Sequence, residues 1–201
     1  MAVAGKIGAV YKADGVSTTF TDETTTADAA KLRYRITNAA KRYWDDSAAV
    51  TVKKNGVTQS NGFTLEMAGG VVVFTAALTS EVILVSGKYF TVAQMATFFD
   101  WKLDIERDTK DVTTFASNGW KESLSTLIGW SASAEGYWAD GSFLAMVGNR
   151  IILVLYVDYV GADRYEGYII LKKNSIEEPV DDIVKETVEF EGTGALYYHD
   201  I

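Results

Sequence analysis

The residue types that most often carry catalysis are scarce in this sequence. It contains one histidine, His199, and no cysteine. Ser-His-Asp triads, Cys-His pairs and histidine-rich metal sites therefore lack necessary parts, and thiolate chemistry and disulfides are excluded. Because His199 stands close to the end of the sequence, we expect it to be a solvated residue without a catalytic role.

Carboxylates are the remaining candidates for acid–base chemistry. They are closely spaced at Asp45-Asp46, at Asp104, Glu106 and Asp108, at Glu177-Glu178 and at Asp181-Asp182. Such groups could hydrolyse glycosides or bind a hard cation. However, Asp104 and Glu106 lie on the polar face of a predicted strand, where charges commonly serve solubility, and Asp181-Asp182 lacks the ligand spacing of a calcium site. We predict no catalytic residue, no metal ligand and no enzymatic activity.

Glycine-rich segments give no sign of phosphate binding. Neither a P-loop nor a GxGxxG motif occurs, and neither Gly69-Gly70 nor Gly192-Thr193-Gly194 opens a helix after a strand. We interpret both segments as turns, and we predict no cofactor and no cofactor-binding residue.

The charge is acidic overall and unevenly distributed. The net charge is −8, whereas residues 31–54 sum to +5 and residues 171–201 to −5. An acidic chain is not an ordinary nucleic-acid binder, because affinity for phosphates comes from clustered Lys and Arg. The opposite patches suit a self-assembling subunit, in which Arg33, Arg35 and Lys41 meet the acidic segment of a neighbour. Equally, both could be solvated faces.

Hydrophobic alternation predicts a chain made mainly of strands. In 101–106 the apolar side chains fall on one face and the charges on the other, and Asn55-Gly56 is typical of a tight hairpin turn. The apolar run 151–157 indicates a deeply buried strand. Further strands are predicted at 49–52, 63–67, 71–74, 82–85, 128–138, 167–171 and 184–191.

Other segments are predicted to be loops or short helices. The Thr- and Asp-rich residues 14–28 are interpreted as a long exposed loop, and residues 177–182 around Pro179 as a connection. Trp120, Leu124, Leu127 and Ile128 share one face of a helix, and 93–99 is a second helical candidate.

These elements predict a mainly β fold, a barrel or sandwich with one short helix and a small inserted β subdomain. The expected division is 1–29 as an N-terminal arm and first strand, 30–90 as the insert and 91–201 as the main β domain. Trp101, Trp130 and Tyr168 fall at strand positions that fill a core or an interface. The first residues lack the apolar run of a secretory signal, and no stretch is long enough to span a membrane, so we expect synthesis in a cytoplasm and no membrane association.

Several segments resemble the major tail tube proteins of siphophages and related prophages. In the middle these are DWKLDIERD (100–108), DVTTF (111–115) and GW (119–120), and towards the end YEGYIIL (165–171), PVDDIVK (179–185) and FEGTGAL (190–196). Residues 34–45 and 70–74 resemble an insert found in some prophage tail proteins.

The resemblance implies a structural virion protein, made in the host cytoplasm and located in the virion tail. It implies hexameric rings that stack into a conduit for phage DNA ejection, without specific binding of the DNA. Implied partners are other copies of the chain and the tape measure, tail tip and terminator proteins. The N-terminal arm and residues 14–28 are candidates for the stacking contact, and the insert is expected to project outward or to brace neighbouring subunits.

Two other functions stay open on sequence alone. The aromatic residues and the modular insert also suit a β-sandwich module of a phage or bacterium that binds carbohydrate or another surface. A glycoside hydrolase that uses carboxylates alone, with Asp104 or Glu106 as the acid, is the third possibility.

Overall fold

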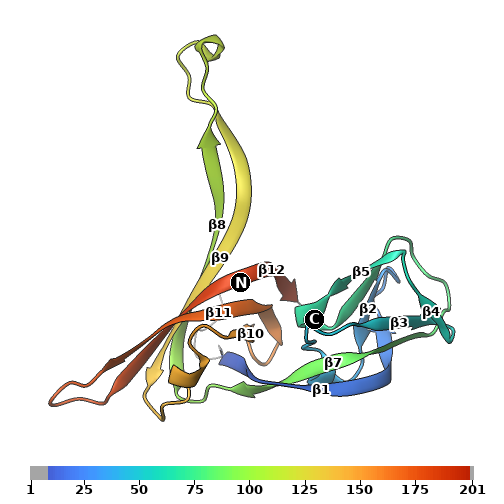
Figure 1. Ribbon diagram of the computed structural model, residues 1–201, viewed down its shortest axis with the longest axis horizontal. Coiled ribbons are helices and arrows are strands. Elements are labelled where there is room, and N and C mark those ends of the chain that lie inside the picture. Colours follow the sequence, from blue (N-terminus) through green and yellow to red (C-terminus); the bar gives the residue numbers. More distant parts are fainter. Residues whose placement is uncertain (1–8, 200–201) are drawn as a thin grey trace. The chain divides into compact units, whose positions relative to one another are not determined.

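A computed structural model describes residues 9–199, which form twelve strands and four short 3-10 helices (Figure 1). The fold is mainly β, as predicted. The strands are antiparallel, and their order runs from β4 (Val57–Gln59) at one end to β8 (Phe98–Asp111) at the other without closing into a barrel. Among these residues no helix has the length and apolarity to cross a membrane.

The chain divides into two compact units. The first unit contains the residues up to Ala96, Arg150–Tyr168 and the residues from Tyr197 on, and the second contains Thr97–Asn149 and Ile169–Leu196. The segment 30–90 that the sequence analysis treated as an insert lies inside the first unit. Strands β11 (Asp163–Glu177) and β12 (Lys185–His199) contribute to both units.

Strand β1 (Ala9–Ala27) organises the first unit. It pairs with β10 (Arg150–Asp158) from Ala9↔Tyr156 to Lys12↔Leu153, and with β7 (Ile83–Gln94) from Tyr11↔Gln94 to Thr24↔Leu84. The prediction of a loop at 14–28 is therefore wrong. Threonine is polar but β-branched, so a Thr-rich segment forms a strand readily where a partner strand satisfies its backbone.

The remaining strands of the first unit are short. β3 (Thr51–Lys54) pairs with both β7 and β4, and a second ladder joins the end of β1 to β2 (Arg33–Ile36), β2 to β6 (Val71–Phe74), and β6 to β5 (Phe63–Glu66). The predicted strands in 49–85 are thus confirmed, as is the turn at Asn55 and Gly56, which have φ of 50° and 81°. The 3-10 helices of this unit are η2 (Ala39–Lys41) and η3 (Met67–Gly69).

The core of the first unit centres on Trp44. Its side chain is fully buried, its ring stacks on Phe20 with centroids 6.1 Å apart, and its indole donates to the carbonyl oxygen of Lys41 at 3.0 Å. The other buried members of this core are Tyr34, Ile36, Val52, Val72, Phe74, Ile83 and Val85. In β10, the consecutive residues 151–155 are all buried, which confirms the prediction of a deeply buried strand.

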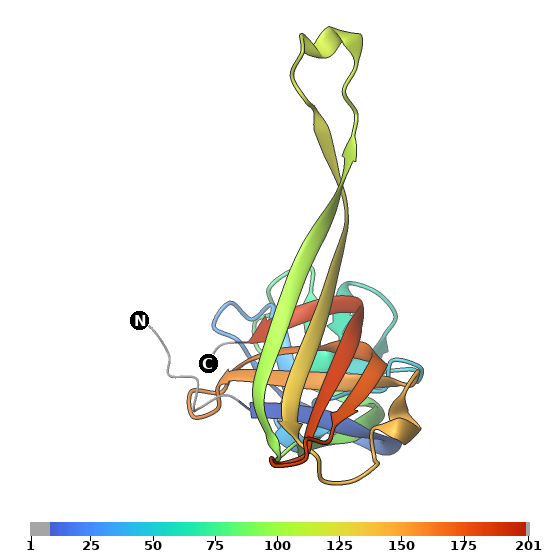
Figure 2. The same ribbon diagram turned by 90° about the vertical axis from the view of Figure 1, so that its left-hand side faces the viewer.

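The second unit contains β8, β9 (Ser123–Tyr137) and the parts of β11 and β12 assigned to it, together with η4 (Phe115–Ser117) and η5 (Leu144–Met146). β9 pairs with β12 from Lys185↔Tyr137 to Glu191↔Ser131, and with β8 from Phe98↔Gly136 to Asp111↔Ser123. The β8–β9 hairpin continues past the other strands of its own unit as a twisted two-stranded ribbon that ends in η4 (Figure 2).

Both predicted helices are absent. Leu124, Leu127 and Ile128 belong to β9, and residues 93–99 are divided between the end of β7 and the start of β8. The ladder between β8 and β9 outweighs a helical periodicity of only three to four side chains. The turn expected at Gly192-Thr193-Gly194 is also wrong, because these residues lie within β12.

The packing of Trp44 gives a direct test of the first core. Trp44→Ala should lower the free energy of unfolding by about 3–5 kcal/mol, because it leaves a large cavity and removes an indole hydrogen bond. Val57→Ala is the control, since Val57 is 65% exposed, and it should change the stability by less than about 0.5 kcal/mol. Urea denaturation of the two variants measures the difference, and equal effects would contradict the assignment of Trp44 to the core.

Candidate functional site

The carboxylates singled out in the sequence lie in three different places. Asp45 is 8% exposed and accepts hydrogen bonds from the backbone and hydroxyl of Ser47, and Asp46 pairs with Arg150 at 2.5 Å, so both have structural contacts. Glu177, Glu178, Asp181 and Asp182 are exposed at the connection between β11 and β12. Within residues 9–199, no group of three His, Asp or Glu side chains is arranged to hold a metal ion.

The remaining group, around Asp104, lines a groove of the second unit. The groove has a volume of about 230 Å³, and its walls are Asp104, Glu106, Asp108, Gly129, Trp130, Ser131 and Glu191. Asp104 lies opposite Ser131, which in turn lies opposite Glu191. Asp104 pairs with Lys102 at 2.7 Å and Glu191 with Lys172 at 3.4 Å. Two of the four groove carboxylates thus have lysine partners, and none of the four is buried.

The groove is part of a larger charged face. Residues directly opposite one another in antiparallel strands share a face, and Glu189, Ser133 and Lys102 form such a row, as do Glu191, Ser131 and Asp104. The charged face consists of Asp100, Lys102, Asp104, Glu106, Ser131, Ser133, Glu135, Lys185, Glu189 and Glu191. Carboxylates outnumber lysines on it, so it carries a net negative charge.

The opposite face of these strands is apolar apart from the buried Glu186, as the alternation in 101–106 predicted. Ala132, Ala134, Val188 and Phe190 are buried there, and Trp130 is 7% exposed. The indole of Trp130 donates to the carbonyl oxygen of Gly194 at 3.1 Å and lies directly over Gly192, where a Cβ would be 2.3 Å from the ring. Gly192 therefore permits a close approach of the indole and does not form a turn. Trp130 and Tyr168 are core residues, which is one of the two roles predicted for them.

We define residues 105–128 as the β8–β9 arm. The arm exposes many large apolar side chains, which are therefore not part of a core. Trp120 is 79% exposed, Leu127 78% and Phe115 fully exposed, and Ile105, Val112, Leu124 and Ile128 are exposed as well. Sequence reasoning had placed four of these residues on a helix. Large apolar side chains exposed together on one segment indicate a place where another molecule binds.

The tip of the arm is an ordered structure. Thr114 and Ser117 form a reciprocal capping box, and the amide of Trp120 donates to the carbonyl oxygen of Ser117 at 2.9 Å. Asn118, with φ of 49°, then reverses the chain towards β9. Phe115 and Trp120 are therefore presented on a scaffold with its own hydrogen bonds, which lowers the entropy lost when a partner covers them.

Strand β8 is also an edge strand. It pairs with β9 and, within the described part of the chain, with no other strand. An edge of this length offers a row of backbone donors and acceptors to a further strand.

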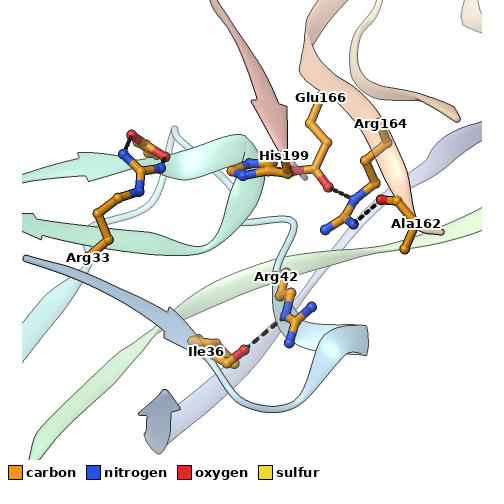
Figure 3. A network of polar contacts seen from close by, with 8 residues as sticks. Arg33, Ile36, Arg42, Ala162, Arg164, Glu166 and His199 are labelled. Carbon is orange, nitrogen blue, oxygen red and sulfur yellow. Dashed lines mark hydrogen bonds and ion pairs between the residues drawn. The ribbon is translucent and has the colours of Figure 1, made fainter. Parts of the chain in front are cut away.

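A buried polar network in the first unit was not predicted. Figure 3 shows Arg164 reaching the carboxylate of Glu166, and His199 approaching that carboxylate from the other side. Arg164 also donates to the carbonyl oxygen of Ala162 at 2.9 Å, and the Nε2 atom of His199 lies 3.0 Å from Oε2 of Glu166. Arg164 is 4% exposed, Glu166 0% and His199 6%, so the expectation of a solvated His199 is wrong. No motif signalled this network, because its members are far apart in the sequence.

Two features maintain this network. Burial by itself would raise the pKa of Glu166, but the contacts with His199 and Arg164 outweigh burial and hold this pKa below its ordinary value. A Cβ at Gly69 would be 2.5 Å from the His199 ring, so the ring fits only because position 69 is glycine.

Comparison with known proteins identifies the family. Residues 84–198, more than half of the chain, match the family described as phage tail tube protein. The chain belongs to this family. This tail tube protein is accordingly a structural component of the virion tail. The matched segment begins in β7 and contains β8 to β11 and nearly all of β12, and it therefore includes the arm, the charged face and Glu166.

Two solved structures are also similar to this tail tube protein. One comes from the virion of a native gene transfer agent particle and the other from the tail of an empty particle of that kind, computed with helical refinement and C6 symmetry. Each is 16% identical with a TM-score of 0.45 over 54% of this chain, and the alignments cover 88% and 87% of the two chains respectively. No curated protein matches the sequence.

The contact between Trp130 and Gly192 predicts that a larger residue at position 192 destabilises the protein. Gly192→Ala should destabilise the protein by about 1–3 kcal/mol, because the new methyl group would overlap the indole. Gly129→Ala is the matched control in β9, where a Cβ meets nothing within 4 Å. Thermal unfolding with Trp fluorescence compares the two, and the assignment is contradicted if Gly129→Ala is the more harmful change.

The buried network predicts a defined pH dependence. Glu166→Gln should cost about 3–5 kcal/mol at pH 7, because Arg164 loses its buried partner. Since folding lowers the pKa of Glu166, the carboxylate stabilises the protein fully above the unfolded-state pKa of about 4.3, and this contribution is lost as the pH falls towards the folded-state pKa. The stability gap between wild type and Glu166→Gln should therefore narrow below pH about 4.3. Glu178→Gln, at an exposed site, is the control and should have the same stability as the wild type at each pH.

Proposed function

We propose that this tail tube protein assembles into rings of six subunits, and that the rings stack into a tube through which phage DNA is ejected. The β8–β9 arm carries this proposal, because its exposed apolar residues and ordered tip require a partner surface that its own strands do not supply. Family membership supports a tube as the assembly. The ring number of six follows from the resemblance noted in the sequence.

Ring closure needs an interface that repeats around an axis. Such an interface is heterologous, so one surface of a subunit must fit a different surface of the next. The open edge of β8 fits this requirement, because a neighbouring strand can satisfy its backbone groups and extend the sheet across the subunit boundary.

Stacking needs a second contact, directed along the tube. We assign it to the arm, whose Phe115 and Trp120 are large, rigid side chains of the type that dominates binding energy at interfaces. We do not assign it to residues 14–28, the earlier candidate, because most of β1 is paired with β7 and β2 of its own subunit. Residues 1–8 lie outside the described part of the chain.

The charged face suits the wall of a conduit. Excess carboxylates repel DNA phosphates, so that a duplex can pass without being held. We therefore propose that the charged face lines the lumen, that DNA is a passing cargo, and that the segment 30–90 projects outward.

Stacked rings do not close on themselves, so other proteins must meet the two ends of the tube. We propose that the tape measure, tail tip and terminator proteins are the remaining partners. A module that binds carbohydrate is disfavoured by the burial of Trp130 and Tyr168, which removes two of the aromatic residues that had suggested it.

Electron microscopy of the purified protein tests the proposal. Negative staining at rising concentration should show rings and hollow tubes for the wild type. Leu124→Ser combined with Leu127→Ser should raise the concentration needed for tubes by tenfold or more, because it removes two exposed apolar contacts. Val57→Ser combined with Val160→Ser, at sites 65% and 84% exposed in the first unit, is the matched control. A monodisperse monomer at every concentration would instead favour the binding module.

A further inference from the structure

Three arginines of the first unit lie near one stretch of chain that packs against the buried carboxylate of Glu166. Arg164 contacts Glu166 directly. The other two arginines flank the same stretch of chain, since a Cβ at Gly69 would lie 3.0 Å from Glu166, a Cβ at Gly70 would lie 2.7 Å from the backbone of Arg42, and Arg35 pairs with Val71. We call Arg35, Arg42 and Arg164 the basic cluster. Arg33 does not belong to it, because its guanidinium is held by both carboxylate oxygens of Glu66. With one acid and three guanidinium groups, the site has two positive charges in excess even when His199 is neutral.

This excess is costly because the arginines are partly withdrawn from water. Burial, followed by repulsion from Arg164, lowers the pKa of Arg42, and burial likewise lowers the pKa of Arg35. Arg42 uses its guanidinium to donate to the carbonyl oxygens of Ile36 and Thr37, as Figure 3 shows for Ile36. Within residues 9–199, no group accepts a hydrogen bond from the Arg35 guanidinium. A second carboxylate would offset the charge and bind these donors.

The chain also carries a set of exposed carboxylates that have no cationic partner among the described residues. The acidic loop, which we define as residues 177–183, contains Glu177, Glu178, Asp181 and Asp182. Within the described part of the chain, none of the four pairs with a lysine or arginine. The loop also exposes Val180 fully and Ile183 by 59%, so it combines acidic and apolar side chains in one short segment.

We propose that the basic cluster of one subunit binds the acidic loop of a second copy of this chain. The loop fits better than the charged face, where Asp104, Glu135, Glu189 and Glu191 already have lysine partners. The loop and the cluster are different surfaces, so a subunit can receive a loop from one neighbour and place its own loop on another, as a repeating assembly requires. This inference rests on the proposed self-assembly and identifies one of its interfaces.

The absence of native cysteine allows a direct positional test. Two single-cysteine proteins, Arg35→Cys and Asp181→Cys, are mixed under assembly conditions and treated with a short bismaleimide. A heterodimer should form on denaturing gels in the assembled mixture and should be lost when high salt keeps the subunits apart. Val57→Cys mixed with Asp181→Cys is the control and should not cross-link. Assembled tubes that yield no heterodimer from the first pair would overturn the inference.

A charge test measures the contribution of the contact. Changing Glu178, Asp181 and Asp182 to their amides should raise the concentration at half-assembly about tenfold in low salt, and Arg35→Gln should act in the same direction. The two changes combined should be less than additive, because they remove the same contact. Asp140→Asn, at an exposed site outside the arm, the acidic loop and the charged face, is the matched control. The thermal stability of the unassembled subunit should be unchanged by the loop changes.

Other occupants of the cluster give different results. If inorganic phosphate stabilises the unassembled wild type and not Arg35→Gln, the cluster is a site for free anions, and the inference fails. If Asp200→Asn changes the salt dependence of assembly and the loop variants do not, the carboxylate comes from the same chain, and the inference also fails. If the wild type forms no assembly at all, the proposed function fails, which is distinguishable from tubes that form normally with the loop neutralised.

Discussion

The pairing of β8 with a single partner strand is the constraint on which the functional surfaces depend. β9 satisfies the backbone donors and acceptors on one side of β8 only, so the other side is left to water or to a further strand. The hairpin also continues beyond the other strands of its unit, so Trp120, Leu124 and Leu127 have no apolar layer from these strands to pack against. An isolated subunit therefore leaves both a backbone edge and an apolar arm uncovered, and assembly is the physical way to cover them.

The two units differ in how far their charged side chains are neutralised by ion pairs. In the first, opposite charges are neutralised in pairs, as in Arg33–Glu66, Lys41–Glu23 and Lys53–Asp22, which accounts for much of the basic excess seen in residues 31–54. Arg33 and Lys41, once candidates for contacts with a neighbour, thus have partners in their own unit. In the second unit, carboxylates spread over one face of the sheet and lysines only partly balance them. The first arrangement neutralises charge within the unit, whereas the second leaves one face of the sheet with a net negative charge.

The sequence was informative where a segment contained its own signal. The alternation in 63–67, 71–74 and 101–106, the apolar run at 151–157 and the Asn55-Gly56 turn all predicted the observed elements, because the spacing of side chains along a strand is a local property. Prediction failed for β1, for the arm and for Gly192. Threonine-rich β1 and the apolar residues of the arm became strands through their partners, and Gly192 has its role only because Trp130 lies over it.

By itself, then, the sequence determined that the protein is mainly β, that it has no thiol chemistry and that its charge is divided into basic and acidic segments. It also contained the segments that resemble tail tube proteins. Only the tertiary structure decided that His199 is buried against Glu166, that Arg164 pairs with this carboxylate, and that four apolar residues lie on an exposed hairpin and not on a helix. The physical reason is that local patterning decides which side chains share a face, whereas burial, ion pairing and edge exposure depend on strands that are distant in sequence and meet only on folding.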